Sequence, residues 1–477
     1  MIENRTLFFG DNLEILRDKF KGGDGYFDLI YLDPPFNSNR AYNVLFKEGK
    51  VDSSAQIHAF EDIWQWTDYT IKLFEELKQY GNPEIAILIS SLYEFIHDTP
   101  MMAYLVNMTA RLIPLKRVLK PTGSIYLHCD PTASHYLKII MDVIFSPKNF
   151  RNEIIWFYKT GGVSKNWFGR KHDVILFYTN DSTYFFKQQI EKSYLSHKYG
   201  FKDIVIKEDK GGYYTEVGMR DVWDIPALRG NQPEALGYPT QKPEAVLERI
   251  LHASTKEGDW VLDPFCGCGT TVAVAERLRR NWVGIDISMQ SINVIAQRME
   301  AHYPNIELHL HGIPKDFEGA VSLAADDKFA FQDWAITLVG ANPPQGEPRK
   351  GADRGVDGLI LFKEQASFDN KNPKLNKIIV QVKGGGHGRH DVATLKGDMG
   401  TEGAPMGIFI CLNEPTPEMK RVANLAGQYK FSDAVSFPKI QILSIKDWFN
   451  GKQVLVPSTK INPFRTAEAR ADQSSLL

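Results

Sequence analysis

An acidic side chain and two prolines come directly after a short apolar run. Residues 27–36 read FDLIYLDPPF, so Asp33, Pro34, Pro35 and Phe36 follow a segment typical of a buried strand. Two consecutive prolines cannot continue a central strand, and their fixed φ angles hold the turn stiffly. The segment therefore predicts a carboxylate, a proline carbonyl and an aromatic ring that are fixed relative to one another.

Such an arrangement suits the binding of an exocyclic amino group. Asp33 can accept one N–H, the Pro34 carbonyl can accept the other, and Phe36 can stack on the ring that carries the nitrogen. Holding both hydrogens directs the nitrogen lone pair out of the ring plane, toward a methyl group held in line. A rigid strand-end turn with an Asp cap would use the same residues, and Asp-Pro-Pro alone does not separate the two interpretations.

A second strand, turn and helix carries two glycines. Residues 261–271 read VLDPFCGCGTT, in which Gly267 and Gly269 allow the backbone to approach a ligand at a helix N-terminus. Asp286 follows the next apolar run, about twenty residues on, where a carboxylate can accept ribose hydroxyls. Val272 replaces the third glycine of the dinucleotide fingerprint, so an adenosyl ligand fits better than NAD. A tight structural turn is the alternative.

These motifs lie in segments whose apolar spacing alternates between strand and helix. Residues 27–32 and 123–129 are typical of strands and residues 104–119 of a helix, and the alternation returns over residues 239–310. Such alternation predicts an α/β fold, with a Rossmann-like parallel sheet covered by helices on both faces.

Length and composition limit the classes of protein to which the chain can belong. At roughly 150 residues per domain, 477 residues predict about two to four domains. The 56 Lys and Arg residues nearly balance 58 Asp and Glu, which excludes a polycationic tail but not a basic groove. Four cysteines and the absence of any run of about 18 apolar residues argue against a disulfide scaffold and a membrane span. We therefore expect a cytoplasmic protein with no membrane partner.

Together the two motifs resemble those of the beta class of amino-DNA methyltransferases, which transfer a methyl group from S-adenosylmethionine to adenine N6 or cytosine N4. The resemblance covers about residues 1–310 and includes the order of the motifs. It implies a methyltransferase sheet, S-adenosylmethionine as cofactor, double-stranded DNA as partner, and catalytic roles for Asp33, Pro34, Pro35 and Phe36. It implies cofactor contacts at eight residues: Asp11, Thr240, Lys242, Asp263, Phe265, Gly267, Gly269 and Asp286. An initial Asp favours adenine, because cytosine N4 enzymes of the family more often begin with Ser; cytosine N4 is the alternative.

Between the motifs, residues 151–235 are expected to recognise the target. A base inside a duplex cannot reach such a pocket and has to be flipped out. Residues 151–172 interleave cations with aromatic rings, a composition typical of nucleic-acid surfaces. The DNA-binding candidates are Lys159, Lys165, Arg170 and Lys171. A solvated loop over a small aromatic cluster would have the same composition.

The C-terminal region carries a separate set of polar residues. Asp357 begins one apolar run, and Gln381 and Lys383 end another, where strand alternation places both on one face. Asp357 and the Gln381 amide oxygen can hold Mg²⁺, while Lys383 orients an attacking water. The pattern resembles the Mrr-like branch of the PD-(D/E)xK nucleases over residues 329–445. Gln381 stands where most of that superfamily has an acid. The C-terminal region could therefore either cleave DNA or only bind it, and the sequence leaves both alternatives open.

We therefore predict a DNA adenine-N6 methyltransferase fused to an Mg²⁺-dependent endonuclease, in one restriction–modification chain. The expected divisions are a methyltransferase domain over 1–315, a linker over 316–328, a smaller α/β restriction-endonuclease-like domain over 329–457 and a flexible tail over 458–477. A DNA-binding module with a silent cofactor pocket, and an RNA target, are the alternatives. A second copy of the chain is a candidate partner.

Overall fold

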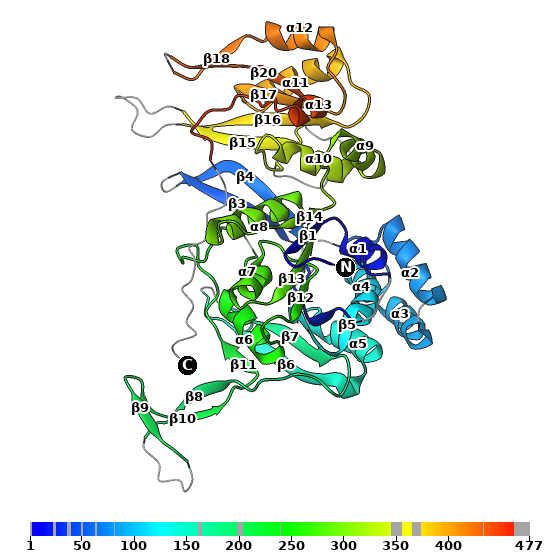
Figure 1. The fold of residues 1–477 in the computed structure, drawn as a ribbon, viewed down its shortest axis with the longest axis vertical. Coiled ribbons are helices and arrows are strands. Elements are labelled where there is room, and N and C mark those ends of the chain that lie inside the picture. Colours follow the sequence, from blue (N-terminus) through cyan, green and yellow to red (C-terminus); the bar gives the residue numbers. More distant parts are fainter. Residues whose placement is uncertain are drawn as a thin grey trace.

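The computed structural model describes residues 2–21, 25–35, 40–48, 51–62, 64–80, 82–160, 165–197, 204–238, 240–344, 355–364, 374–432 and 434–461. They form a large sheet with helices on both faces and a smaller α/β unit beyond it, as Figure 1 shows. Among these residues, no helix combines the length and the apolar character that crossing a bilayer requires.

Nine strands form the large sheet. Their order is β11 (Val222–Asp224), β6 (Phe150–Phe157), β7 (His172–Thr179), β5 (Leu119–Cys129), β2 (Phe27–Leu32), β12 (Trp260–Asp263), β13 (Asn281–Asp286), β1 (Thr6–Phe9) and β14 (His309–His311). All neighbours are parallel except those of β7, which runs antiparallel to both β5 and β6. The predicted Rossmann-like sheet is confirmed, and the carboxyl ends of β1, β2, β12 and β13 meet at one edge.

Helices cover the two faces because successive residues of each strand point to opposite sides. On one face lie α1 (Asn12–Asp18), α2 (Asp68–Tyr80), α3 (Pro83–Ile96), α4 (Pro100–Val118) and α5 (Ser134–Phe145). On the other lie α6 (Glu244–Ser254), α7 (Thr270–Arg277) and α8 (Met289–His302). In β2, for example, Ile30 and Leu32 pack with the first group, while Leu29 and Tyr31 pack with the second.

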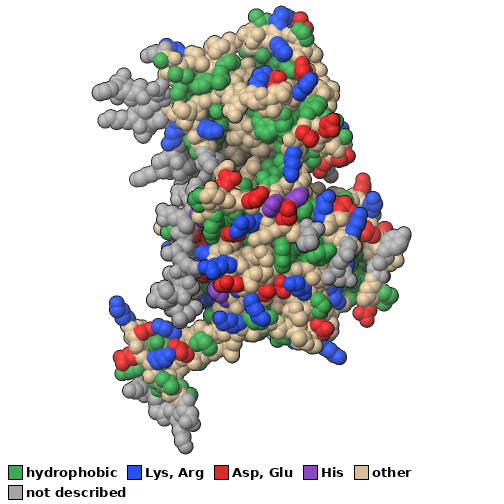
Figure 2. Space-filling model, viewed as in Figure 1, with side chains coloured by type: hydrophobic (Ala, Val, Ile, Leu, Met, Phe, Trp, Pro, Cys, Tyr) green, Lys and Arg blue, Asp and Glu red, His purple; other side chains and the backbone are tan. Residues whose placement is uncertain are grey.

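Two smaller sheets extend from this body. The hairpin of β3 (Arg40–Glu48) and β4 (Val51–Asp62) follows the Asp33 turn in the sequence. An antiparallel sheet of β8 (Ile190–Tyr194), β10 (Gly212–Gly218) and β9 (Lys207–Asp209) projects away from the body as an arm (Figures 1 and 2). Residues 151–235 therefore contribute β6, β7 and β11 to the large sheet, and only the arm stands apart from it. A short 3-10 helix, η1 (Pro147–Asn149), precedes β6.

The C-terminal unit has a four-stranded sheet of its own. The order is β15 (Gly358–Lys363), β16 (Leu375–Lys383), β17 (Met406–Cys411) and β20 (Ile440–Ser444), with only the first pair antiparallel. The helices of the unit are α9 (Phe317–Asp326), α10 (Lys328–Thr337), α11 (Arg389–Thr401), α12 (Pro417–Leu425) and α13 (Ile445–Phe449). A two-stranded ribbon pairs β18 (Gln428–Lys430) with β19 (Ser436–Pro438).

The linker expected over residues 316–328 is instead helix α9. Asp316 caps it by accepting a hydrogen bond from the Gly319 backbone N–H at 2.7 Å, and Ala320 and Ala324 are buried against α10. Apolar residues three and four positions apart produce that buried stripe, which the acidic residues around it obscure in the sequence. The start of the expected tail is also ordered, because the Ile461 backbone N–H bonds the Leu361 carbonyl at 2.8 Å. Residues 462–477 lie outside the described residues.

Candidate active site and cofactor cavity

The two motifs predicted from the sequence line one cavity of about 630 Å³ at the carboxyl edge of the large sheet. Ten of the predicted residues line it: Asp11, Asp33, Pro34, Pro35, Thr240, Lys242, Asp263, Phe265, Gly267 and Asp286. Phe36, predicted to stack on the base, lies outside the described residues. A cavity of this size is within the usual range for nucleoside-sized ligands.

Asp33 stands just beyond β2 and is paired with Lys242. The Lys242 ammonium donates to both carboxylate oxygens, at 2.7 and 2.5 Å, and the Asp33 side chain is 17% exposed. The pairing joins positions 209 residues apart, so the Asp-Pro-Pro turn gave no indication of it. Lys242 is therefore paired with the candidate catalytic carboxylate, whereas the resemblance implied that Lys242 contacts the cofactor.

A buried polar chain lies beneath Asp33. The Tyr31 hydroxyl is 2.8 Å from His128 Nδ1, and His128 Nε2 is 3.3 Å from an Asp173 carboxylate oxygen. Tyr158 donates to the other Asp173 oxygen at 3.1 Å, and His128 Nδ1 is 3.9 Å from Asp33. Burial raises the pKa of Tyr31 well above its ordinary value, so its hydroxyl stays protonated and available to donate.

The glycine turn supports one cofactor acid directly. Gly267 has φ +49° and donates its N–H to Asp286 Oδ2 at 2.7 Å. Gly269 has φ +77° and caps α7, but it does not line the cavity. A Cβ on Gly269 would stand 2.7 Å from Ile295 Cγ1, so this glycine permits the turn to approach α8 closely.

The carboxylates of the cavity differ in their partners. Burial raises the pKa of Asp263 to about 7 and that of Asp286 to about 6, because the charged forms are desolvated. Asp33 and Asp11 are paired with Lys242 and Arg111, whereas no salt bridge within the described chain reaches Asp263 or Asp286. The cavity thus holds two buried carboxylates that a cationic ligand could pair with.

The wall opposite the glycine turn was not predicted. Arg111, buried on α4, donates to Asp11 at 2.8 Å and to Asn12 at 2.7 Å. Asn12 in turn donates to the Pro264 carbonyl at 2.7 Å, which joins the β1 and β12 turns. Trp64 lies over Arg111 and donates to the Pro35 carbonyl at 3.2 Å. These contacts span up to 252 residues, and no local sequence signal identifies them.

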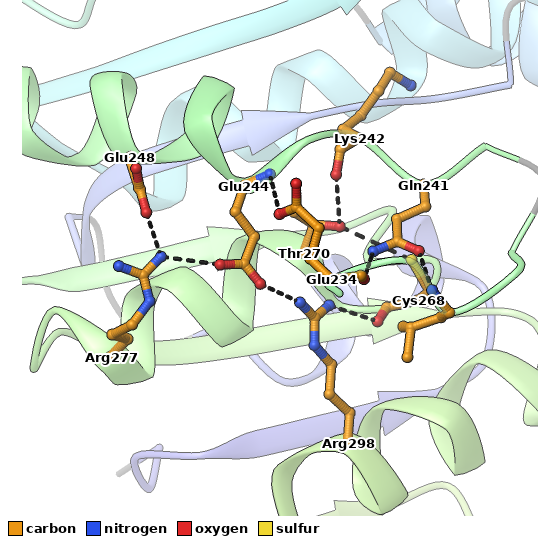
Figure 3. Close-up of polar contacts among 10 residues, drawn as sticks. Glu234, Gln241, Lys242, Glu244, Glu248, Cys268, Thr270, Arg277 and Arg298 are labelled. Atoms are coloured by element: carbon orange, nitrogen blue, oxygen red, sulfur yellow. Dashed lines mark hydrogen bonds and ion pairs between the residues drawn. The ribbon is translucent and has the colours of Figure 1, made fainter. Parts of the chain in front are cut away.

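A buried ion-pair network lies behind the glycine turn (Figure 3). Glu244, at the start of α6, pairs with Arg298 of α8 at 2.6 Å and with Arg277 of α7 at 3.1 Å. Arg298 also donates to the Cys268 carbonyl at 3.3 Å. The network therefore joins the helix that follows Lys242 to the glycine turn. All of its charges are on residues far apart in sequence, and sequence reasoning missed it.

The residues predicted to bind DNA lie at the surface. Lys159 pairs with Asp224 at 2.8 Å, and Lys171 donates to the Thr160 hydroxyl at 2.9 Å. Lys165 and Arg170 are exposed. None of the four lines the cavity, so the structure places them outside the site that holds Asp33.

The C-terminal candidates lie together across β15 and β16. Asp357, one residue before β15, accepts a hydrogen bond from the Val382 backbone N–H at 2.7 Å. The buried Gln381 donates from Nε2 to Asp398 of α11 at 2.6 Å, and Lys383 is half exposed, 3.9 Å from Asp391. Asp398, which the sequence did not indicate, brings a second carboxylate beside Gln381. Among the residues described, no group of three or more His, Cys, Asp or Glu side chains is arranged to hold a metal.

Comparison with known proteins agrees with these two parts. A family model described as DNA methylase matches residues 27–298, and one described as restriction endonuclease matches residues 329–439. The chain is 28% identical to the DNA adenine methyltransferase YhdJ of Escherichia coli (strain K12), over 64% of this chain and 87% of that protein. It is 30% identical to the Type II methyltransferase M2.LlaDCHI of Lactococcus lactis subsp. cremoris, over 62% of this chain and 90% of that protein.

Among solved structures, the M1.HpyAVI complex with SAM matches at 17% identity and a TM-score of 0.34, over 62% of this chain and 98% of that one. The DNA methylase model spans more than half of the chain, and the Asp33 turn and the glycine turn of the chain line one cavity. The chain therefore belongs to the DNA methylase family, as an S-adenosylmethionine-dependent DNA methyltransferase of the N6/N4 group that also carries an Mrr-like nuclease domain.

Proposed function

We propose that this methyltransferase modifies adenine at N6, on a base flipped out of double-stranded DNA. The observation that carries the proposal is the common cavity of the Asp33 turn and the glycine turn. Reacting groups held in one cavity gain the advantage of proximity and orientation, which supplies much of the acceleration in such transfers. An adenine-named relative and the initial Asp of the turn favour adenine over cytosine.

In this proposal Asp33 accepts one N–H of the target amino group and the Pro34 carbonyl accepts the other. Lys242 occupies both Asp33 oxygens in the structure, in the place of a donating amino group. An entering base would share or displace that ammonium. Tyr31 and His128 support the turn from beneath, so that Asp33 keeps its position during the exchange. Asp33 then takes up the proton that the nitrogen loses as it gains the methyl group.

The residues of the glycine turn fit S-adenosylmethionine. When bound, the cofactor supplies an electrophilic methyl group on a sulfonium, and it also carries an ammonium. Asp286, held by the Gly267 N–H, would accept the ribose hydroxyls, and Asp263 would face the positive charge of the cofactor. Phe265 and Pro264 enclose the same side of the cavity. The negative charge of these two carboxylates therefore suits a ligand with a net positive charge.

The test is the identity of the methylated nucleoside. Purified protein is incubated with S-adenosylmethionine labelled in the methyl group and mixed-sequence duplex DNA, and the product is digested to nucleosides and separated. We expect label in N6-methyl-2′-deoxyadenosine, and we expect none with Asp33→Ala. Label only in N4-methylcytosine would refute the choice of base, and equal label with Asp33→Ala would refute the assignment of the turn.

We further propose that the C-terminal unit cleaves DNA with Mg²⁺, which would make the chain a restriction–modification enzyme. Asp357 and Gln381 lie side by side on antiparallel strands, and Asp398 adds a carboxylate. Mg²⁺ suits such a sparse set, because it is commonly held by one or two carboxylates, substrate phosphates and water. Bound there, Mg²⁺ would act as a Lewis acid on the phosphodiester. Lys383 would orient the attacking water.

Cleavage is tested on supercoiled plasmid with and without Mg²⁺. The nuclease proposal expects metal-dependent nicking or cutting that Lys383→Ala abolishes and Asp33→Ala does not affect. DNA retention without cleavage, in both wild type and Lys383→Ala, would favour a C-terminal unit that only binds DNA.

A further inference from the structure

The cofactor turn and the nuclease sheet share one buried apolar cluster. Its buried members, here called the shared cluster, are Leu236, Tyr238, Cys268, Val294 and Leu361. Four of them belong to the methyltransferase, and Leu361 belongs to β15, the edge strand of the nuclease sheet. The half-buried Leu375 and Ile461 pack around it.

Two members of the shared cluster also line the cofactor cavity. Tyr238 and Cys268 stand on either side of Gly267, and a Cβ on Gly267 would be 3.8 Å from the Tyr238 ring. Tyr238 is fixed from behind by a 3.1 Å hydrogen bond between its hydroxyl and Ser291 of α8. One apolar cluster therefore extends from the wall of the cofactor cavity to the nuclease strand.

Helix α8 makes a second connection between the two parts. Its N-terminus follows Asp286, and its N-cap Ser288 lines the cavity. Two residues further, Gln290 donates to Asn342 of the C-terminal unit at 2.7 Å, and α8 packs against α10. Asn342 is itself bonded to Leu359 of β15 through both backbone groups. The apolar and the polar connections thus reach the same strand.

Close packing makes these contacts energetically relevant. Protein interiors are packed like organic crystals, so a side chain that moves at one end of such a cluster alters the contacts at the other. A ligand that favours one position of Tyr238 then favours one packing of Leu361, and by linkage the reverse holds to the same extent.

We propose that the nuclease domain supports the cofactor site from behind its wall. Leu361 acts as a positioning residue: through the shared cluster it holds Tyr238 and the glycine turn in place for the cofactor. Cofactor occupancy and the packing of β15 are therefore coupled, and Asp357 begins the segment that would respond. The inference rests on the proposed cofactor cavity but is separate from the choice of base and from cleavage.

The test measures S-adenosylhomocysteine affinity of the full chain by titration calorimetry, with wild type, Leu361→Ala and Leu395→Ala. Leu361 does not line the cavity. Leu395 is an equally buried leucine of α11 in a separate cluster confined to the C-terminal unit, and it provides the matched control. We expect Leu361→Ala to weaken the affinity about fivefold or more, the lower end of typical coupling effects, and Leu395→Ala to leave it within about twofold.

A second measurement does not depend on one core substitution. Asn342→Ala removes only the polar connection and is expected to weaken the affinity in the same direction. In hydrogen exchange, bound S-adenosylhomocysteine should slow exchange of residues 358–363 in wild type, and this protection should be lost in Leu361→Ala.

The inference would be overturned if both Leu361→Ala and Asn342→Ala bound S-adenosylhomocysteine as tightly as wild type. It would also be overturned if Leu395→Ala weakened this affinity as much as Leu361→Ala, because that result would indicate general destabilisation. Failure of wild type to bind S-adenosylhomocysteine at all would instead refute the proposed cofactor cavity, and the inference with it. The two failures are therefore distinguishable by the wild-type titration alone.

Discussion

Cofactor binding should depend on pH, because Asp263 and Asp286 are buried without a cationic partner among the described residues. Their pKa values are raised to about 7 and about 6 by burial. A cationic ligand favours the ionised carboxylates, so binding has to be accompanied by loss of the protons they carry. Affinity is therefore expected to rise as the pH rises through both values.

The size of the effect follows from the two titrations. If only the doubly ionised cavity binds, pKa values of about 7 and about 6 make the dissociation constant about fifteenfold weaker at pH 6 than at pH 7.5. Near pH 6.5 about three quarters of Asp263 and one quarter of Asp286 would be protonated, so binding should release about one proton.

Calorimetry checks both numbers in the same experiment. Titrating S-adenosylmethionine, the cationic form of the cofactor, in two buffers of different ionisation enthalpy at pH 6.5 gives the protons released, and repeating it at pH 6 and 7.5 gives the affinity ratio. Asp263→Asn should remove most of the pH dependence, since Asp263 has the higher pKa. The binding heat could instead be the same in both buffers, and the affinity at pH 6 and at pH 7.5 could agree within about twofold. Those two results together would refute the assignment of Asp263 and Asp286 as carboxylates without a cationic partner.

Three further predictions concern residues that the structure places around the cavity. Lys242→Met should lower the methylation kcat on the order of a hundredfold, because a misplaced Asp33 disturbs the reacting geometry. The same variant should change the affinity for S-adenosylhomocysteine little. Weaker affinity with an unchanged kcat would indicate that Lys242 contacts the cofactor instead. Gly269→Ala should lower the free energy of unfolding by about 1–3 kcal/mol in urea, because φ is +77° and the new Cβ would meet Ile295. Gly267 also has a positive φ, but its Cβ would stand 3.8 Å from the Tyr238 ring, which is an ordinary contact distance. Gly267→Ala should therefore cost less stability than Gly269→Ala and should weaken cofactor binding, because it adds a methyl group to the cavity wall; identical behaviour of the two variants would contradict this separation. Arg298→Met should cost about 3 kcal/mol in urea unfolding, the lower end for breaking a buried pair, since Arg277 still pairs with Glu244; a loss below about 1 kcal/mol would contradict the ion pair.

The motifs were predictable because the geometry they need is local. Asp33 follows β2 directly and Gly267 follows β12 after three residues, and strand, turn and helix fix the position of the next few residues. The carboxyl ends of parallel strands share one edge of the sheet, so two such turns were expected to face each other. The alternation of apolar residues indicated the strands themselves, and the apolar runs that became β15 and β16 were identified in the same way.

The partners of these residues were not predictable, because they are set by the order of the strands and helices. Arg111 reaches Asp11 from 100 positions away, and Lys242 reaches Asp33 from 209. Arg111 looks like an ordinary surface charge in the sequence, and Lys242 was predicted as a cofactor contact, not as the partner of Asp33. Asp398 is similarly one acid of a helix until the sheet brings Gln381 to it. Helix α9 was missed for a different reason, since its buried stripe consists largely of alanines.

Charge pairing, more than the motifs, determines which ligand the cavity prefers. The sequence indicated four carboxylates around the site, and four like charges together would repel one another and attract cations without selectivity. The fold neutralises two of them with Lys242 and Arg111 and leaves Asp263 and Asp286 on the side of the glycine turn. The uncompensated charge is thus restricted to the cofactor side, and the Asp33 side can receive a neutral base. A cationic methyl donor and a neutral methyl acceptor would then occupy adjoining parts of one cavity, which is the arrangement that in-line transfer between them requires.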